Sequence, residues 1–163
     1  MATLTGARAA STFPVGSLSH NNNVLNVAWG VYTLAANPTA ADIIRFCRVP
    51  AGATVIDGWF IGADIDTGTE ALDIDIGWEA NGTDAADPDG FGNFGVLTGA
   101  AITGLKPVAG IRMPFANILQ DAGYKTFAAE TYISGTVVAA ANAGGTGLLK
   151  VIVWYVGGGI LTP

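Results

Sequence analysis

The sequence predicts an all-β protein, folded as a single β-sandwich of seven or eight strands with a jelly-roll-like topology. Short runs of β-branched and aromatic residues recur along the chain, separated by turn signals at a spacing of roughly 8 to 12 residues. No convincing amphipathic helix interrupts them, and residues 116–122 are the best short helical candidate. The length of 163 residues suits one well-filled core and is too short for two domains.

The two ends of the chain are predicted to lie outside the sandwich. Residues 1–22 are rich in Ala, Thr, Ser and Gly and are expected to form an extended N-terminal arm. Such an arm either stays without fixed structure or lies across a neighbouring chain and adds main-chain hydrogen bonds there. The sandwich domain is expected over residues 23–156, followed by a C-terminal tail at 157–163.

Three predicted strands open the domain. They span residues 24–34, 42–49 and 54–62, where β-branched and aromatic residues are frequent. Pro50-Ala51-Gly52-Ala53 is a turn signal between the second and the third. These two strands are therefore expected to pair as neighbours.

The clearest period-two pattern lies at residues 72–79. Its two faces carry Leu72, Ile74, Ile76 and Trp78 on one side and Asp73, Asp75 and Glu79 on the other. Asn81-Gly82 follows at once and is suited to positive φ in a tight turn. Because Asp73 and Asp75 share a face, their repulsion is tolerable only in water, near a cation, or opposite basic residues of a partner.

A long acidic, Gly-rich loop is expected over residues 83–109, with a short helical turn near residues 91–97. Further strands are predicted at 111–115, 131–140 and 147–156, with a Gly-rich hairpin link at 144–147. The four tryptophans all fall on predicted strands, so core packing is the default for them, although one or two could anchor an interface. They are Trp29, Trp59, Trp78 and Trp154.

The composition indicates that part of the surface is covered by other chains. Half of the residues are apolar, only 12% are charged, and the mean hydropathy is +0.44, whereas a soluble domain carries about 25% charged residues. A surface of Thr, Asn, Ser and Gly is the alternative explanation. The net charge of −6 argues against a nucleic-acid binder. No apolar run approaches the roughly 20 residues of a membrane-spanning helix.

No catalytic or cofactor site is expected. Residues 90–95 match the Gly-x-Gly-x-x-Gly spacing of a dinucleotide site, but the required preceding strand, following helix and later acidic residue are absent from the sequence pattern. The single His20 lies in the polar arm, where no third group is evident to orient it. Cys47 is the only cysteine and is expected to be buried and inert. The sequence therefore favours a protein that is not an enzyme.

Acidic residues are concentrated in one part of the chain. Nine of the thirteen fall between Asp64 and Asp89, and no Lys or Arg occurs between residues 49 and 105. Asp84, Asp87 and Asp89 are candidate calcium ligands, because carboxylates on a turn can bind Ca²⁺. A solvated acidic loop is the favoured alternative, since their spacing fits no complete calcium loop.

Three segments carry a resemblance to a known class of proteins. They are the Ala/Thr-rich start at residues 2–11, the strand and Val-Pro-Ala-Gly turn at 42–53, and the continuation at 54–66. In these segments the chain resembles the small head-decoration (cement) and accessory virion proteins of tailed bacteriophages. The resemblance implies a β-sandwich or β-barrel that assembles as a trimer or another small oligomer on a capsid lattice.

The resemblance also implies a location and partners. The chain would be made in the host cytoplasm and bind the major capsid protein at the capsid surface of the virion. Expected interface residues come from the arm, the acidic face and the Gly-rich loop: Thr3, Leu4, Phe13, Asp73, Asp75, Phe91 and Phe94. A receptor- or carbohydrate-binding module of a phage tail is the alternative, and it predicts an exposed aromatic or calcium-dependent pocket in residues 83–109.

Overall fold

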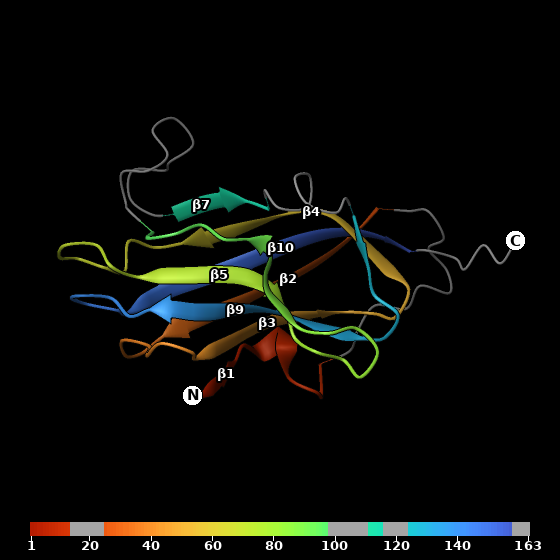
Figure 1. Cartoon of the computed structure of the whole chain (residues 1–163), viewed down its shortest axis with the longest axis horizontal. Helices are drawn as coiled ribbons and strands as arrows, with labels where there is room; N and C mark the ends of the chain where they lie inside the picture. Colours follow the sequence, from red (N-terminus) through yellow and green to blue (C-terminus); the bar gives the residue numbers. More distant parts are fainter. Residues whose placement is uncertain (14–24, 98–110, 116–123, 158–163) are drawn as a thin grey trace, which may run out of the picture.

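Two β-sheets stack face to face in the computed structural model of the chain (Figure 1). The structure describes residues 1–13, 25–97, 111–115 and 124–157. Sheet A has the order β1-β3-β9-β5-β6, and sheet B has the order β2-β10-β4-β7, with β8 beside β4. The strands in the described residues are β1 (Thr3–Thr5), β2 (Leu25–Leu34), β3 (Ile43–Val49), β4 (Ala53–Gly62), β5 (Asp73–Trp78), β6 (Asp87–Gly92), β7 (Ile111–Pro114), β8 (Lys125–Thr126), β9 (Thr131–Ala139) and β10 (Gly147–Gly157).

This architecture confirms the predicted all-β sandwich, and its strand order is compatible with a jelly roll. Three short strands, β1, β6 and β8, were not predicted. The described part of the chain contains one short 3₁₀ helix, η1 (Ala7–Ala9). None of its helices is long and apolar enough to cross a membrane.

Two predicted strand pairings are wrong. β3 and β4 lie in different sheets, so the turn at residues 50–52 carries the chain from one sheet to the other. β9 and β10 are likewise separated, and the link at 144–147 is a crossing between sheets and not a hairpin. The physical reason is burial, because each of these strands has an apolar face. Placing the two strands in stacked sheets covers both apolar faces, whereas pairing them edge to edge within one sheet would leave the faces uncovered.

Alternating side chains of both sheets fill the core. Leu72, Ile74, Ile76 and Trp78 are buried on the inner side of sheet A, as the period-two pattern predicts. Sheet B contributes Leu149, Val151, Val153 and Tyr155 from β10. Phe46 of β3 and Phe60 of β4 meet across the sheets with ring centroids 6.2 Å apart. Cys47 is buried, as predicted, and burial raises the pKa of its thiol to about 12.

An aromatic cluster holds β6 in place inside the predicted 83–109 loop. Phe91 of β6 stacks on Phe115 at 5.0 Å and packs against Trp78 at 5.0 Å, and Trp78 meets Phe127 edge-on at 5.4 Å. Burying Phe91 draws residues 87–92 into a strand beside β5. The helical turn expected near residues 91–97 is absent from the structure, and residues 98–109 of the predicted loop lie outside the described residues.

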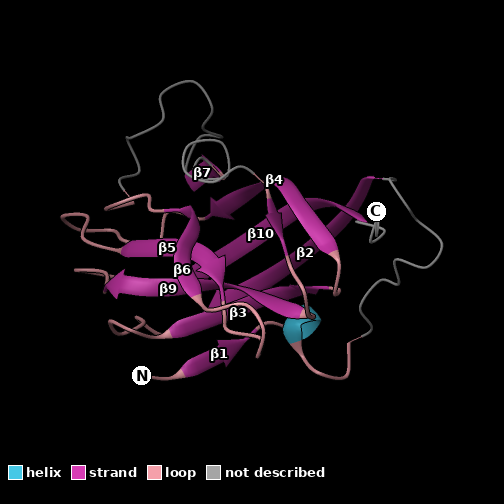
Figure 2. Cartoon of the chain, turned by 45° about the vertical axis from the view of Figure 1, so that its right-hand side comes forward, coloured by secondary structure: helices cyan, strands magenta, loops and turns pink. Residues whose placement is uncertain are grey.

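The first thirteen residues lie against the chain's own sheet, in contrast to the extended arm expected there (Figure 2). β1 pairs in parallel with β3, and the Ala2 amide donates to Asp42 at 2.7 Å. Arg48 donates to the carbonyl oxygens of Ala10 and Phe13. The pairing with β1 satisfies main-chain groups along the β3 edge, and the side chains of Asp42 and Arg48 hold the residues on either side of β1, which explains the placement. Residues 14–22 of the expected arm lie outside the described residues.

Phe91→Ala tests whether this side chain serves the core or an interface. We expect the isolated protein to lose about 3 to 5 kcal/mol in free energy of unfolding, because the change removes a buried ring and leaves a cavity. Urea unfolding measures the loss. Val138→Ala, on an exposed side chain of β9, is the control and should change stability little. Unchanged stability of Phe91→Ala would contradict the core assignment.

Candidate functional site

Two neighbouring carboxylates of β5 are poorly supplied with partners. Asp75 is only 7% exposed, and the Oδ1 atoms of Asp73 and Asp75 are buried without a hydrogen-bond partner in the described part of the chain. Burial, followed by the charges of Asp73 and Asp89, raises the pKa of Asp75 to about 6. Burial also raises the pKa of Asp73.

The sequence left three conditions under which Asp73 and Asp75 could share a face despite their repulsion: hydration, a nearby cation, or basic residues of a partner. Because Asp75 is buried, free hydration is not available to it. Protonation supplies a further condition, because a neutral carboxyl group costs much less to bury than a carboxylate. Near neutral pH, ionised Asp75 is therefore a destabilising element of sheet A in the isolated chain.

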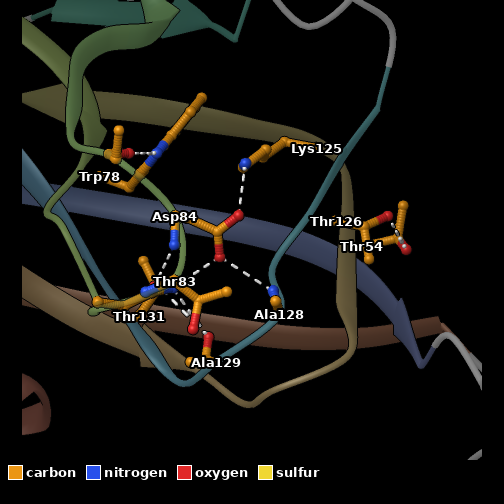
Figure 3. Close-up of polar contacts among 11 residues, drawn as sticks. Thr54, Trp78, Thr83, Asp84, Lys125, Thr126, Ala128, Ala129 and Thr131 are labelled. Carbon is orange, nitrogen blue, oxygen red and sulfur yellow. Dashed lines mark hydrogen bonds and ion pairs between the residues drawn. The ribbon is translucent and has the colours of Figure 1, made fainter.

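Asp84 has the opposite environment (Figure 3). Lys125 Nζ lies 2.9 Å from its Oδ1, while Asn81 Nδ2 and the Ala128 amide donate to its Oδ2 at 2.8 and 3.0 Å. Hydrogen bonds from Asn81 and Lys125 lower the pKa of Asp84. The predicted Asn81-Gly82 turn is confirmed, with φ of +91° at Gly82. Asp84 thus fastens the turn after β5 to the segment between β8 and β9.

The three candidate calcium ligands therefore differ in their surroundings. Asp84 is engaged by three protein donors. Asp87 and Asp89 are close together on β6, and burial, followed by the neighbouring Asp89, raises the pKa of Asp87. Within the described ranges, no group of three His, Cys, Asp or Glu side chains is arranged to hold a metal ion. The calcium hypothesis stays a prediction without a ready ligand set in that part of the chain.

The outer side of sheet B carries the largest run of exposed apolar side chains in the described structure. On β2, Leu25, Val27 and Trp29 point outward and are 55%, 51% and 39% exposed. In register, Trp29 lies opposite Ile152 of β10, which lies opposite Trp59 of β4. We call the following residues the apolar face: Leu25, Val27, Trp29, Val31, Trp59, Ile61, Leu148, Ile152, Trp154 and Val156.

An apolar outer face is unusual for an antiparallel sheet, whose solvent side normally carries polar residues. Contiguous apolar surface of this kind marks interaction sites. Two cations border it, since Arg8 lies 3.9 Å from the Trp29 ring centroid and Lys150 lies 5.4 Å from it. The apolar face is the candidate functional site of the described structure.

The default assignment of all four tryptophans to the core holds only for Trp78, which is buried. Trp29, Trp59 and Trp154 lie on the apolar face. A signal was present on β2, where small residues alternate with large ones. Gly30 faces inward at a position that has no room for a side chain, because a Cβ atom there would lie 1.9 Å from the Phe46 carbonyl oxygen. The close approach of β2 to β3 at Gly30 thus leaves Val27, Trp29 and Val31 on the outer side, whereas Tyr32 and Leu34 of the same strand face the core.

The interface residues expected from the sequence do not belong to sheet B. Thr3 is exposed and Leu4 half-buried on β1, and Phe13 is half-buried with the Arg8 guanidinium 4.6 Å from its ring centroid. Phe94 is half-buried and stacks on Phe60. Phe91 lies fully in the core of the described structure, which does not offer its side chain to a partner, and its role at an interface stays a prediction. The remaining two, Asp73 and Asp75, are the poorly partnered acids of β5.

Comparison with known proteins gives matches of fold alone. No family model and no curated protein sequence matches the chain. A chain from the capsid of Ralstonia phage GP4 has a TM-score of 0.65 at 18% identity, over 96% of this chain and 99% of that one. A chain from the capsid of cyanophage Pam1 has a TM-score of 0.61 at 19% identity, over 91% and 96%. A chain from the acidic stable capsid of Helicobacter pylori bacteriophage KHP30 has a TM-score of 0.51 at 14% identity, over 83% and 90%.

Asp75→Asn tests the cost of the buried acid. The pKa of Asp75 rises from its ordinary value of 3.8 to about 6 on folding, so the folded chain binds this proton more tightly than the unfolded chain. Its contribution to stability is fully present below pH 3.8 and is lost as the pH rises through about 6. We expect Asp75→Asn to gain stability relative to the wild type as the pH rises through this window, measured by chemical unfolding.

The control for this experiment is Asp64→Asn, on an exposed acid. Asp66 and Asp84, whose pKa values are lowered by hydrogen bonds, lose their contributions as the pH falls below 3.8, outside the window tested. Parallel pH profiles for the wild type and Asp75→Asn would contradict the assignment.

Proposed function

We propose that the chain is a non-enzymatic structural protein of a phage virion, and that it decorates the capsid surface and stabilises the shell by binding the major capsid protein. The observation that carries this proposal is the likeness in fold to chains of three phage capsids. For the Ralstonia phage GP4 chain the match spans nearly the whole of both chains. The likeness therefore extends over the sandwich as a whole and is not limited to a few strands.

The distribution of polar groups supports a structural role. Asp66 accepts hydrogen bonds from the amides of Ala71 and Leu72 on one loop and of Asn142 and Ala143 on another. Asp84 ties two further segments together. These carboxylates fasten loops of the sandwich, and their oxygens already accept hydrogen bonds from groups of the chain. Apolar surface is therefore the main feature that remains to bind a partner.

Stabilisation would follow from selective binding. A protein that binds the assembled shell, and does not bind its separate subunits, favours the shell by mass action. An apolar surface suits this role, because its burial at a junction between subunits releases ordered water without a requirement for paired charges. The low content of charged residues, 12%, agrees with a chain that works in an assembly.

The binding partner and the oligomeric state of the chain are also proposals. The trimer implied by the resemblance to decoration proteins stays a prediction, as does the placement on the outside of the capsid. A tail-associated receptor- or carbohydrate-binding module is the alternative function. The two differ in copy number, since a decoration protein covers the lattice and a tail tip is present in few copies.

The copy number in purified virions tests the proposal. We expect quantitative mass spectrometry to find the chain in a fixed, high ratio to the major capsid protein, as repeated lattice binding requires. Particles that lack the chain should release DNA at a lower temperature, and addition of the purified protein should restore the wild-type release temperature. A few copies per particle with unchanged release temperature would contradict decoration and favour the tail module.

A further inference from the structure

We propose that the apolar face of sheet B binds a partner segment that carries a carboxylate, and that this carboxylate contacts Arg8 and Lys150 beside Trp29. The inference rests on the proposed function, in which this face binds the shell. It adds the chemistry of the partner, which is an Asp or Glu side chain of the shell protein with apolar side chains next to it.

Two cations meet at one aromatic ring in a chain that has few cations. The sequence holds seven Lys and Arg residues and has a net charge of −6. The Arg8 guanidinium lies 3.9 Å from the centroid of the Trp29 ring, and Lys150 Nζ lies 5.4 Å from it. Arg8 belongs to η1, whereas Lys150 belongs to β10, the neighbour of β2 in sheet B. The tertiary structure thus brings two of the seven cations to one side chain of the apolar face.

The Arg8 side chain is held by two rings. Its guanidinium lies 4.6 Å from the centroid of the Phe13 ring, in addition to its contact with Trp29. Contacts with ring faces leave the N–H donors of a guanidinium unused, and these donors form a planar fork that matches a carboxylate. Because the rings already restrict the side chain, less conformational freedom is lost when Arg8 binds a planar anion.

Neither cation has an anionic partner in the described part of the chain. The ion pairs there involve Arg45, Arg48 and Lys125, and neither Arg8 nor Lys150 takes part in one. A partner that covers Trp29 also removes water from the two cations, and a cation that loses water without gaining an anion is destabilised. The partner is therefore expected to supply a negative charge at this point.

The neighbours of the two cations decide which kind of anion fits. Lys150 is paired with Val31 in register, and Trp29 is paired with Ile152, so the cations lie in apolar surroundings. Charge-assisted hydrogen bonds are strong where such surroundings exclude water. A nucleic acid is a poor match, because a net charge of −6 repels a polyanion. A single carboxylate among apolar side chains matches both the charge and the surface.

Carbodiimide cross-linking tests the contact directly, because it joins a lysine amine to a carboxylate that touches it. The full chain is bound to purified particles that otherwise lack it, and the cross-links are identified by mass spectrometry. We expect an amide bond between Lys150 and an Asp or Glu of the shell protein. Lys125 and Asp84, 2.9 Å apart, should cross-link within the chain with or without shells and serve as the internal control. Lys150→Arg should keep the binding and lose the cross-link.

Affinity for the same particles, measured by co-sedimentation, tests the contribution of each cation. Arg8→Gln and Lys150→Gln should each weaken binding roughly tenfold. Added salt should weaken binding of the wild type more than that of the double variant, since salt screens the contact. Val138→Glu is the matched control, because it changes the net charge by the same amount on an exposed residue of sheet A and should leave the affinity unchanged. Far-UV circular dichroism verifies the fold of each variant.

The contrary outcomes are distinct. A wild type that sediments with the shells and forms the Lys125–Asp84 amide, but gives no cross-link from Lys150 to the shell, would overturn this inference and leave the proposed function intact. Equal affinities of Lys150→Gln and Val138→Glu would also overturn it. Retention of the wild type on a duplex DNA oligonucleotide, lost in Arg8→Gln, would assign the cations to phosphate and do the same. A wild type that does not sediment with the shells would overturn the proposed function, and this inference with it.

Discussion

Phe91, Trp78, Phe115 and Phe127 pack ring against ring between the two sheets, and the fold around β6 depends on this cluster. Trp78 and Phe91 come from sheet A, whereas Phe115 and Phe127 follow strands of sheet B. Ring contacts of this kind bury large apolar areas in a fixed geometry. They convert part of a Gly-rich acidic stretch into a strand and bring β7 and β8 against the body of the sandwich.

Charged residues are scarce, and several of those described fasten segments together. Arg45 and Glu79 form a bidentate pair at 2.6 Å beneath Tyr132, and Lys125 pairs with Asp84. Arg48 fixes the first residues of the chain to β3. The outer face of sheet B carries few charged side chains, with Lys150 and Asp57 among its rows and Arg8 beside Trp29. The small number of charged residues accounts for the high mean hydropathy of the sequence and for the apolar face.

The outer side of sheet A differs from that of sheet B, because it holds acids whose Oδ1 atoms lack hydrogen-bond partners within the described residues. These acids are Asp73 and Asp75, which gain little from the fold and have raised pKa values. Because natural proteins need only enough stability to function, such costly groups are tolerated, and the isolated chain is then less stable than the packing of its core would allow. The outer sides of the two sheets thus differ chemically: sheet B carries exposed apolar side chains, and sheet A carries a poorly partnered pair of acids beside paired charges.

The sequence by itself determined the all-β class, most strand positions, the inward face of β5 and the Asn81-Gly82 turn, because local alternation and turn chemistry encode them. Only the tertiary structure decided which strands share a sheet, since the turns at 50–52 and 144–147 would suit a hairpin or a crossing equally well. It also decided where the tryptophans lie. The position of Trp29 depends on Gly30 lying against the Phe46 backbone, a contact between sheets that no local pattern contains. The alternation of small and large residues on β2 pointed to this face, but it could not say which side is the outer one, because an apolar side chain has the same local signature on either face of a strand.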